Sequence, residues 1–208
     1  MRYTGVLLLV VLVTGCVQST TKVTKSMEKA PENLGGWIPT GNDDLDITAV
    51  ALTDFLHIPN VTNLTDKSRT SLAVNKMTNG PSDLIAPAQL ATELRRMVIP
   101  IGSIDSLQTR NQTPSEVSWI PPGLAFFSSD LDALPHELEE LQTAFPAIYP
   151  KAIAGVWIWL PGYSEDGQYA IFRFSFAPTP HGAIATYIMA KDDTGKWHMI
   201  DRKINYLG

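Results

Sequence analysis

Four apolar runs in the C-terminal quarter of the chain decide the fold: AIAGVWIWL (152–160), YAIFRFSFA (169–177), AIATYIMA (183–190) and WHMIDRKINY (197–206). Each run is rich in β-branched and aromatic residues, which favour strands. The connections between them are short and contain Pro, Gly and Asp, so consecutive strands have to run antiparallel. The sequence therefore predicts a four-stranded antiparallel meander at the end of the chain.

Both faces of this meander are predicted to be covered. Alternate residues of the second run face opposite sides of the sheet, with Phe172, Phe174 and Phe176 on one side and Tyr169, Ile171, Arg173 and Ser175 on the other. The phenylalanine face should lie against helices. In the first run Trp157 and Trp159 share a face, and the residues on the opposite face are apolar as well, so we expect a second covering layer.

Helices are predicted upstream of the meander from the spacing of apolar residues. They run from about 44 to 56, from Pro87 to about 97 with Arg95 and Arg96 in the last turn, and from about 135 to a stop at Pro146. Short strands are expected over 70–75 and 124–127, an edge strand at best over 98–104, and a loop over 105–118. The predicted class is α+β, with the meander packed against two or three helices.

The first sixteen residues indicate where the protein is located. Arg2 gives a positive start, residues 6–13 are an unbroken apolar run, and Val13-Thr14-Gly15-Cys16 places small residues before the chain's only cysteine. An eight-residue apolar run spans roughly 12 Å as a helix, whereas the hydrocarbon core of a bilayer is about 30 Å thick. The stretch is therefore typical of a secretory signal rather than of a membrane span.

Val13-Thr14-Gly15-Cys16 resembles the lipobox of bacterial lipoprotein precursors. The resemblance implies that residues 1–15 are a cleaved signal peptide, that Cys16 carries lipid, and that the lipid holds the protein on a membrane. Since Val17 is not the aspartate that favours inner-membrane retention in the enteric lipoproteins that this chain resembles, it implies the outer membrane. The alternative, a cleaved signal without lipid, would leave Cys16 as an unpaired thiol.

The rest of the chain divides into a tether and one domain. Residues 16–42 are polar and irregular, and about 20 residues of flexible coil have a root-mean-square reach of about 25 Å. Residues 43–208 are long enough for a single globular α+β domain. The net charge of −5 argues against a nucleic-acid partner, which would require a basic surface.

The C-terminal strands, with Asp193-Thr194-Gly195-Lys196-Trp197 leading into the last one, are similar to those of NTF2-like secreted domains. That resemblance implies a pocket between sheet and helices and transfers no catalytic residue. The candidate pocket residues are Arg173, Tyr169, Trp157 and Trp159, with Arg173 as the anchor for an anionic ligand. The alternative for Arg173 is an ordinary surface arginine on an exposed sheet face.

No cofactor, metal or catalytic residue is predicted. The stretch from His136 to Glu140 has a glutamate where His-Glu-x-x-His needs its second histidine, and therefore fits a solvated helix face. The four histidines (His57, His136, His181 and His198) lie in no recognisable nucleophile or metal motif. We expect a lipid-anchored, non-enzymatic protein that binds an envelope partner or supports an envelope complex. The alternatives are a small-ligand-binding domain and, after that, an enzyme.

Overall fold

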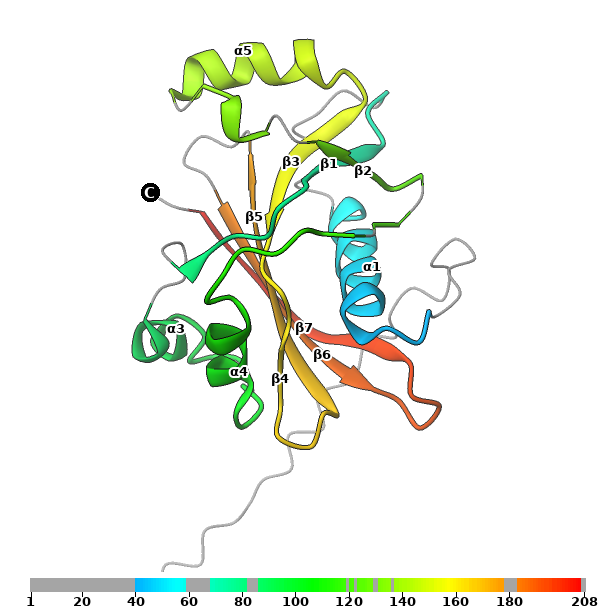
Figure 1. The fold of residues 1–208 in the computed structure, drawn as a ribbon, viewed down its shortest axis with the longest axis vertical. Coiled ribbons are helices and arrows are strands. Elements are labelled where there is room, and N and C mark those ends of the chain that lie inside the picture. Colours follow the sequence, from blue (N-terminus) through cyan, green and yellow to red (C-terminus); the bar gives the residue numbers. More distant parts are fainter. Residues whose placement is uncertain are drawn as a thin grey trace, which may run out of the picture.

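A mixed β-sheet with helices on both faces forms the centre of the computed structural model (Figure 1). The structure describes residues 40–58, 68–81, 86–118, 120–121, 123–128, 131–135, 137–177 and 183–206. The helices are α1 (Asp43–Leu56), α3 (Pro87–Glu93), α4 (Ser103–Arg110) and α5 (Leu138–Ile148), with a 3-10 turn, η2 (Leu131–Ala133). The strands are β1 (Ser71–Asn75), β2 (Ala125–Ser128), β3 (Ala152–Ile158), β4 (Gly162–Tyr163), β5 (Tyr169–Ala177), β6 (Ala183–Lys191) and β7 (Trp197–Tyr206).

The described strands form a seven-stranded sheet in the order β2-β1-β3-β5-β6-β7, and β4 pairs with β5 beside this path. The predicted meander is present as β3, β5, β6 and β7, each of which is antiparallel to the next. Two more strands extend it, because β1 lies parallel between β3 and β2. The α+β class is thus confirmed, whereas the expected four-stranded antiparallel sheet is too small and lacks the parallel pair.

One face of the sheet packs on α1, and the phenylalanines of β5 lie there as predicted. The ring of Phe55 in α1 meets Phe174 and Phe176 edge to face, with ring centroids 5.0 and 4.7 Å apart. Leu72 and Val74 of β1 join the same cluster. Asn42 caps α1 by accepting from the backbone N–H groups of Asp44 and Leu45, so the helix begins where the sequence predicts.

The opposite face carries two separate apolar clusters. Under α3 and α4 the buried residues are Leu90, Leu94, Leu107, Trp159, Ile171 and Ile188. Under η2 and α5, at the other end of the sheet, they are Ala73, Leu131, Leu134, Phe145, Tyr149 and Ala152. Figure 1 shows α5 at one end of the molecule and α3 and α4 toward the other. Both faces of the central strands are therefore covered, as the apolar first run predicted.

One helix was missed, and the bounds of two predicted helices need correction. Residues 103–110, expected to be part of an edge strand and a loop, form α4, because Leu107 packs on the sheet and this tertiary contact stabilises an eight-residue helix that periodicity does not reveal. The second helix ends at Glu93, so Arg95 and Arg96 lie in the turn after it. The third runs from Leu138 to Ile148 and contains Pro146, whose missing N–H costs only one hydrogen bond in the last turn.

Strand β4 was also missed, and it makes the closest contact between α4 and the sheet. A Cβ atom added at Gly162 would lie 2.5 Å from Leu107 Cβ, and closer still to the Ser103 carbonyl oxygen and the Leu107 nitrogen. Only glycine allows this approach.

We predict that Gly162→Ala lowers the free energy of unfolding by about 3 kcal/mol, because helix α4 has to move away from the sheet. Urea titration followed by circular dichroism measures this. Gly80→Ala is the control, since a Cβ there comes no closer than 3.4 Å to the atoms of Pro114, and it should change stability by less than ~0.5 kcal/mol. Equal stability of the two variants would contradict the packing described.

Candidate functional site

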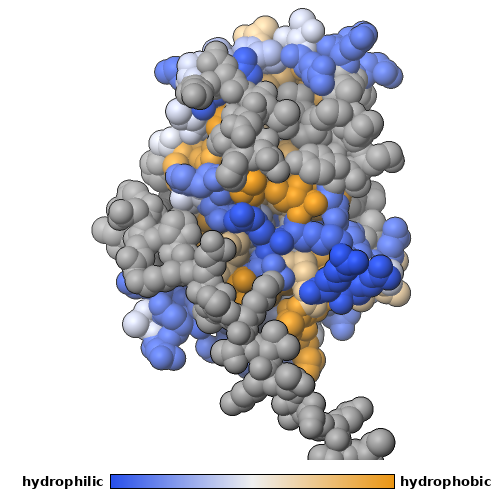
Figure 2. Space-filling view, turned by 180° about the vertical axis from the view of Figure 1, so that it is seen from behind, coloured by the Kyte–Doolittle hydropathy of each residue, from blue (hydrophilic) through white to orange (hydrophobic). Residues whose placement is uncertain are grey.

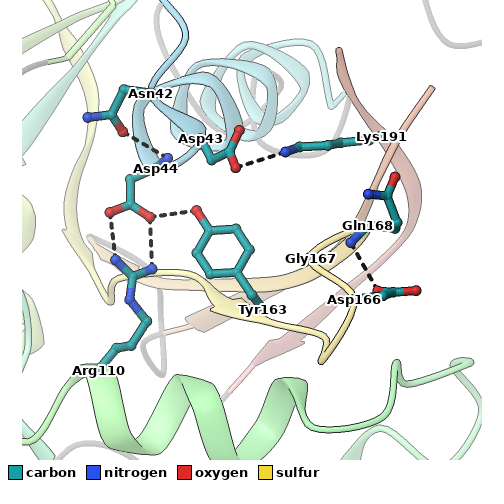
Figure 3. A pocket seen from close by; sticks show the side chains of 9 residues that line it. All are labelled: Asn42, Asp43, Asp44, Arg110, Tyr163, Asp166, Gly167, Gln168 and Lys191. Carbon is teal, nitrogen blue, oxygen red and sulfur yellow. Dashed lines mark hydrogen bonds and ion pairs between the residues drawn. The ribbon is translucent and has the colours of Figure 1, made fainter. Parts of the chain in front are cut away.

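A shallow cavity of about 410 Å³, wide open to solvent, lies at the N-terminal end of α1 (Figure 3). Its walls come from the start of α1, the end of α4, strand β4, the β4–β5 turn and the end of β6. The lining residues are Asn42, Asp43, Asp44, Arg110, Tyr163, Asp166, Gly167, Gln168 and Lys191. The cavity is thus assembled from segments that are far apart in the sequence.

Asp44 is the centre of the first charge network in this cavity. Its two carboxylate oxygens accept from Arg110 Nη1 and Nη2, each at 2.8 Å, in a bidentate ion pair. The Tyr163 hydroxyl donates to Asp44 at 2.6 Å, and the guanidinium of Arg110 lies 5.0 Å from the centre of the Tyr163 ring. Figure 3 shows the three side chains converging from α1, α4 and β4. Asp44 is therefore held in one position by both partners.

These contacts shift the pKa values of all three groups. Burial raises the pKa of Asp44, but the hydrogen bonds from Arg110 and Tyr163 outweigh it and hold the pKa below 3.8. Burial, and then the Asp44 carboxylate, raises the pKa of Tyr163 far above 10.0. The hydrogen bond to Asp44 raises the pKa of Arg110. All three groups keep one protonation state at neutral pH, which suits fixed charges rather than proton transfer.

Asp43 forms a second network on the other side of the cavity. It accepts from Lys191 Nζ at 2.9 Å and from Trp197 Nε1 at 2.8 Å, while Lys191 lies over the Trp197 ring. Both aspartates are in the first turn of α1, where the helix dipole stabilises negative charge. In the turn between β4 and β5, the Asp166 carboxylate accepts from Ser164 Oγ and Gln168 N. The cavity therefore presents oriented charges of both signs to whatever enters it.

The second candidate region surrounds Arg173 on the other face of the sheet. Arg173 is 2% exposed, and its Nη2 contacts Glu93 Oε1 of α3 at 3.4 Å. Within the described part of the chain, Arg173 Nε and Nη1 have no hydrogen-bond partner, and neither has the buried hydroxyl of Thr186, its cross-strand neighbour. Burial lowers the pKa of Arg173, and Glu93 opposes that effect. This guanidinium is thus incompletely paired.

Glu93 joins further polar groups of β7 to this region. Its carboxylate also accepts from Asn205 Nδ2, and Lys203 Nζ donates to the Glu93 backbone oxygen at 2.5 Å. The described charged groups here are Arg173, Lys203 and Glu93, two cations and one carboxylate. Among the described residues one positive charge is thus left over, with Arg173 buried and Lys203 and Glu93 half-buried.

Of the four residues predicted to line one pocket, the structure brings Trp159 and Arg173 together. Trp159 is buried near Arg173, with the guanidinium carbon 6.0 Å from its ring centre. Tyr169 is 41% exposed. Trp157 lies at the edge of the α5 cluster, where its Nε1 donates to Asp132 at 2.8 Å. Arg173 itself is a buried residue, so the alternative of an exposed surface arginine is wrong.

Several other predictions fall on residues outside the described ranges. Cys16, the signal peptide, nearly all of the tether, His136 and His181 belong to these. His57 caps the end of α1 and contacts the Thr53 carbonyl at 2.7 Å. The described residues contain no group of three His, Cys, Asp or Glu side chains that could hold a metal ion. Among them there is also no helix long and apolar enough to cross a membrane.

Comparison with known proteins gives no relative. Family models, curated proteins and solved structures all lack a significant match to this chain. The resemblances to lipoprotein precursors and to NTF2-like domains stay predictions. The charged cavity was not predicted, because Asp43 and Asp44 look like helix-capping residues and nothing in the sequence links them to Arg110, Tyr163 or Lys191.

We predict that Asp44→Asn lowers the free energy of unfolding by about 1 to 3 kcal/mol at pH 7, because Arg110 and Tyr163 lose a charged acceptor. Since the folded pKa of Asp44 lies below 3.8, its contribution is present above that pH and is lost as the pH falls through the folded pKa. Urea titration should therefore show a large difference in the free energy of unfolding between the unaltered protein and Asp44→Asn at pH 7. The difference should be small at the lowest pH at which both proteins fold. Glu139→Gln on the exposed side of α5 is the control. A pH-independent difference would contradict this account.

Proposed function

We propose that this protein is a lipid-anchored, non-enzymatic binding protein of a bacterial cell envelope. Cys16 carries the lipid, residues 16–42 are the tether, and the domain binds an envelope partner or ligand. The lipobox-like Val13-Thr14-Gly15-Cys16 supports the anchor, and Val17 after the cysteine supports the outer membrane as its destination.

The observation that carries the binding role is the charged cavity at the start of α1. Its carboxylates and cations are already paired and oriented, so a polar ligand or partner segment meets fixed charges without ordering them first. The cavity also lies where the tether joins the domain. Thr40, the first described residue, donates its backbone N–H to the buried Asp46 at 2.8 Å, two residues after Asp44.

The anchor is tested by Cys16→Ser in the full-length chain, expressed in a bacterium with two membranes. We expect the unaltered protein to incorporate radiolabelled palmitate and to sediment with outer membranes. The variant should lose the label and should no longer sediment with the outer membranes, because the diacylglycerol is attached through the Cys16 sulfur. Ser19→Ala, in the same segment, should behave like the unaltered protein. A Cys16→Ser variant that still carries label or still sediments with the outer membranes would overturn the anchor.

Arg173 favours a second candidate function, the binding of a small anionic ligand between the sheet and α3. A buried guanidinium with two nitrogens, Nε and Nη1, that have no hydrogen-bond partner among the described residues is costly, since charged donors lose their hydration without replacement. Lys203 adds a second positive charge that the single described carboxylate, Glu93, does not balance. A carboxylate or phosphate group would pair with both features.

Arg173→Gln tests this second function. We expect inorganic phosphate or succinate, added at constant ionic strength, to raise the melting temperature of the detergent-solubilised protein, by an amount equivalent to ~2.7 kcal/mol at one hundred times Kd. The variant should show no such rise. Arg202→Gln removes an arginine that pairs with Asp54 on the α1 side, and it should retain the response. Equal shifts in the unaltered protein and Arg173→Gln would exclude this site.

A further inference from the structure

The connection between α3 and α4 presents two apolar side chains to solvent. Val98 is 88% exposed and Ile101 is 80% exposed, the highest values among the large hydrophobic residues that the structure describes. We call residues 97–102 the apolar loop. Both side chains therefore project from the surface into solvent. Exposed apolar surface is unfavourable in water, and a partner that buried these side chains would remove that cost.

The apolar loop is held in this conformation by its other residues. Met97 and Ile99 pack on the cluster beneath α3 and α4. The backbone N–H and hydroxyl of Ser103 both donate to the Pro100 carbonyl, and Glu165 N donates to the Ile101 carbonyl at 3.4 Å. Val98 and Ile101 therefore project from an ordered loop, so little conformational entropy is lost when they bind something.

The loop lies at the end of the domain where the tether joins it. Its contact with Glu165 connects it to the β4–β5 turn, and Gly167 and Gln168 of that turn line the cavity together with Asn42. Figure 1 shows the α3–α4 connection and the β4–β5 turn at one end of the molecule and α5 at the other. Seen from behind, hydrophobic surface is present at this same lower end, beside hydrophilic side chains (Figure 2).

We propose that the apolar loop inserts Val98 and Ile101 into the interface of the membrane to which Cys16 is attached. This inference rests on the proposed lipid anchor. From Cys16 to Thr40 the chain advances by 24 residues, and a coil of that length, as its polar composition predicts, has a root-mean-square reach of roughly 27 Å. The lipid therefore keeps the loop at an effective concentration of about millimolar near the bilayer. Two side chains that would bind too weakly alone then suffice.

The composition of the loop favours a lipid surface over a protein partner. A stable protein interface buries upwards of about 1,000 Å² with good complementarity, whereas two projecting side chains need no complementary shape in a bilayer. Arg95 and Arg96, both exposed just before the loop, can pair with lipid phosphates. Glu165 and Asp105 offset these charges, so the apolar side chains supply the driving force.

The test places a polarity-sensitive fluorophore on the loop. Because lipid occupies Cys16, the only native cysteine, Ile101→Cys in the full-length protein can be labelled at one site. The labelled protein is reconstituted in vesicles of phosphatidylethanolamine and phosphatidylglycerol. We expect emission at shorter wavelength and quenching by lipids with brominated acyl chains. The matched control is Ile148→Cys on α5, which replaces another exposed isoleucine at the opposite end and should keep a water-like emission.

Two results would overturn the insertion. One is the same emission and the same lack of quenching at positions 101 and 148. The other is a shift at position 101 that requires added envelope proteins, which would make the loop a protein-docking site. Labelling at two thiols in Ile101→Cys would show a free Cys16 and would overturn the anchor instead. Insertion would then be judged in the chain that also carries Cys16→Ser, with a shift upon addition of vesicles supporting it and an unchanged emission overturning it.

Discussion

Burial of β5 on both faces is the constraint on which the rest of the structure depends. Phe172, Phe174 and Phe176 require an apolar layer on one side, and Ile171 requires one on the other. Helix α1 supplies the first layer, and α3 with α4 supplies the second, so segments from both halves of the chain must meet on this strand. Arg173 is enclosed by the same requirement, because it occupies the middle of a strand that has no solvated face.

Sequence patterns predicted the elements in which a strand or helix periodicity continues over many consecutive residues. The four C-terminal strands and α1 follow the residues that alternation and helical spacing indicate. They were insufficient for α4, whose eight residues offer Leu107 as one buried apolar contact, and for the placement of β1. The sequence of Ser71–Asn75 predicts a strand. Its two parallel neighbours, β2 and β3, could not be predicted, because that pairing depends on contacts between residues far apart in the chain.

The charged cavity shows why a site can be missed in the sequence when none of its residues belongs to a recognisable motif. Asp43 and Asp44 stabilise the start of a helix wherever it lies, Tyr163 is a common strand residue, and Lys191 is simply the last residue of β6. These residues form a site only because they lie next to one another. That proximity results from the packing of α1 and α4 against the sheet. The lipobox-like segment is the opposite case, because the processing signal that we predict there depends on consecutive residues and on no fold.

The parallel pairing of β1 with β3 also limits how early during synthesis the native sheet can form. Ser71 donates its hydroxyl to the carbonyl of Lys151, 80 residues later, and the next strand of the sheet, β5, follows later still. Closing such a long loop carries an entropic cost that local contacts do not repay, so the first half has no stable structure of its own while the second is missing. A nascent chain of this design therefore commits to its native topology only after the residues of β3 and β5 have been synthesised.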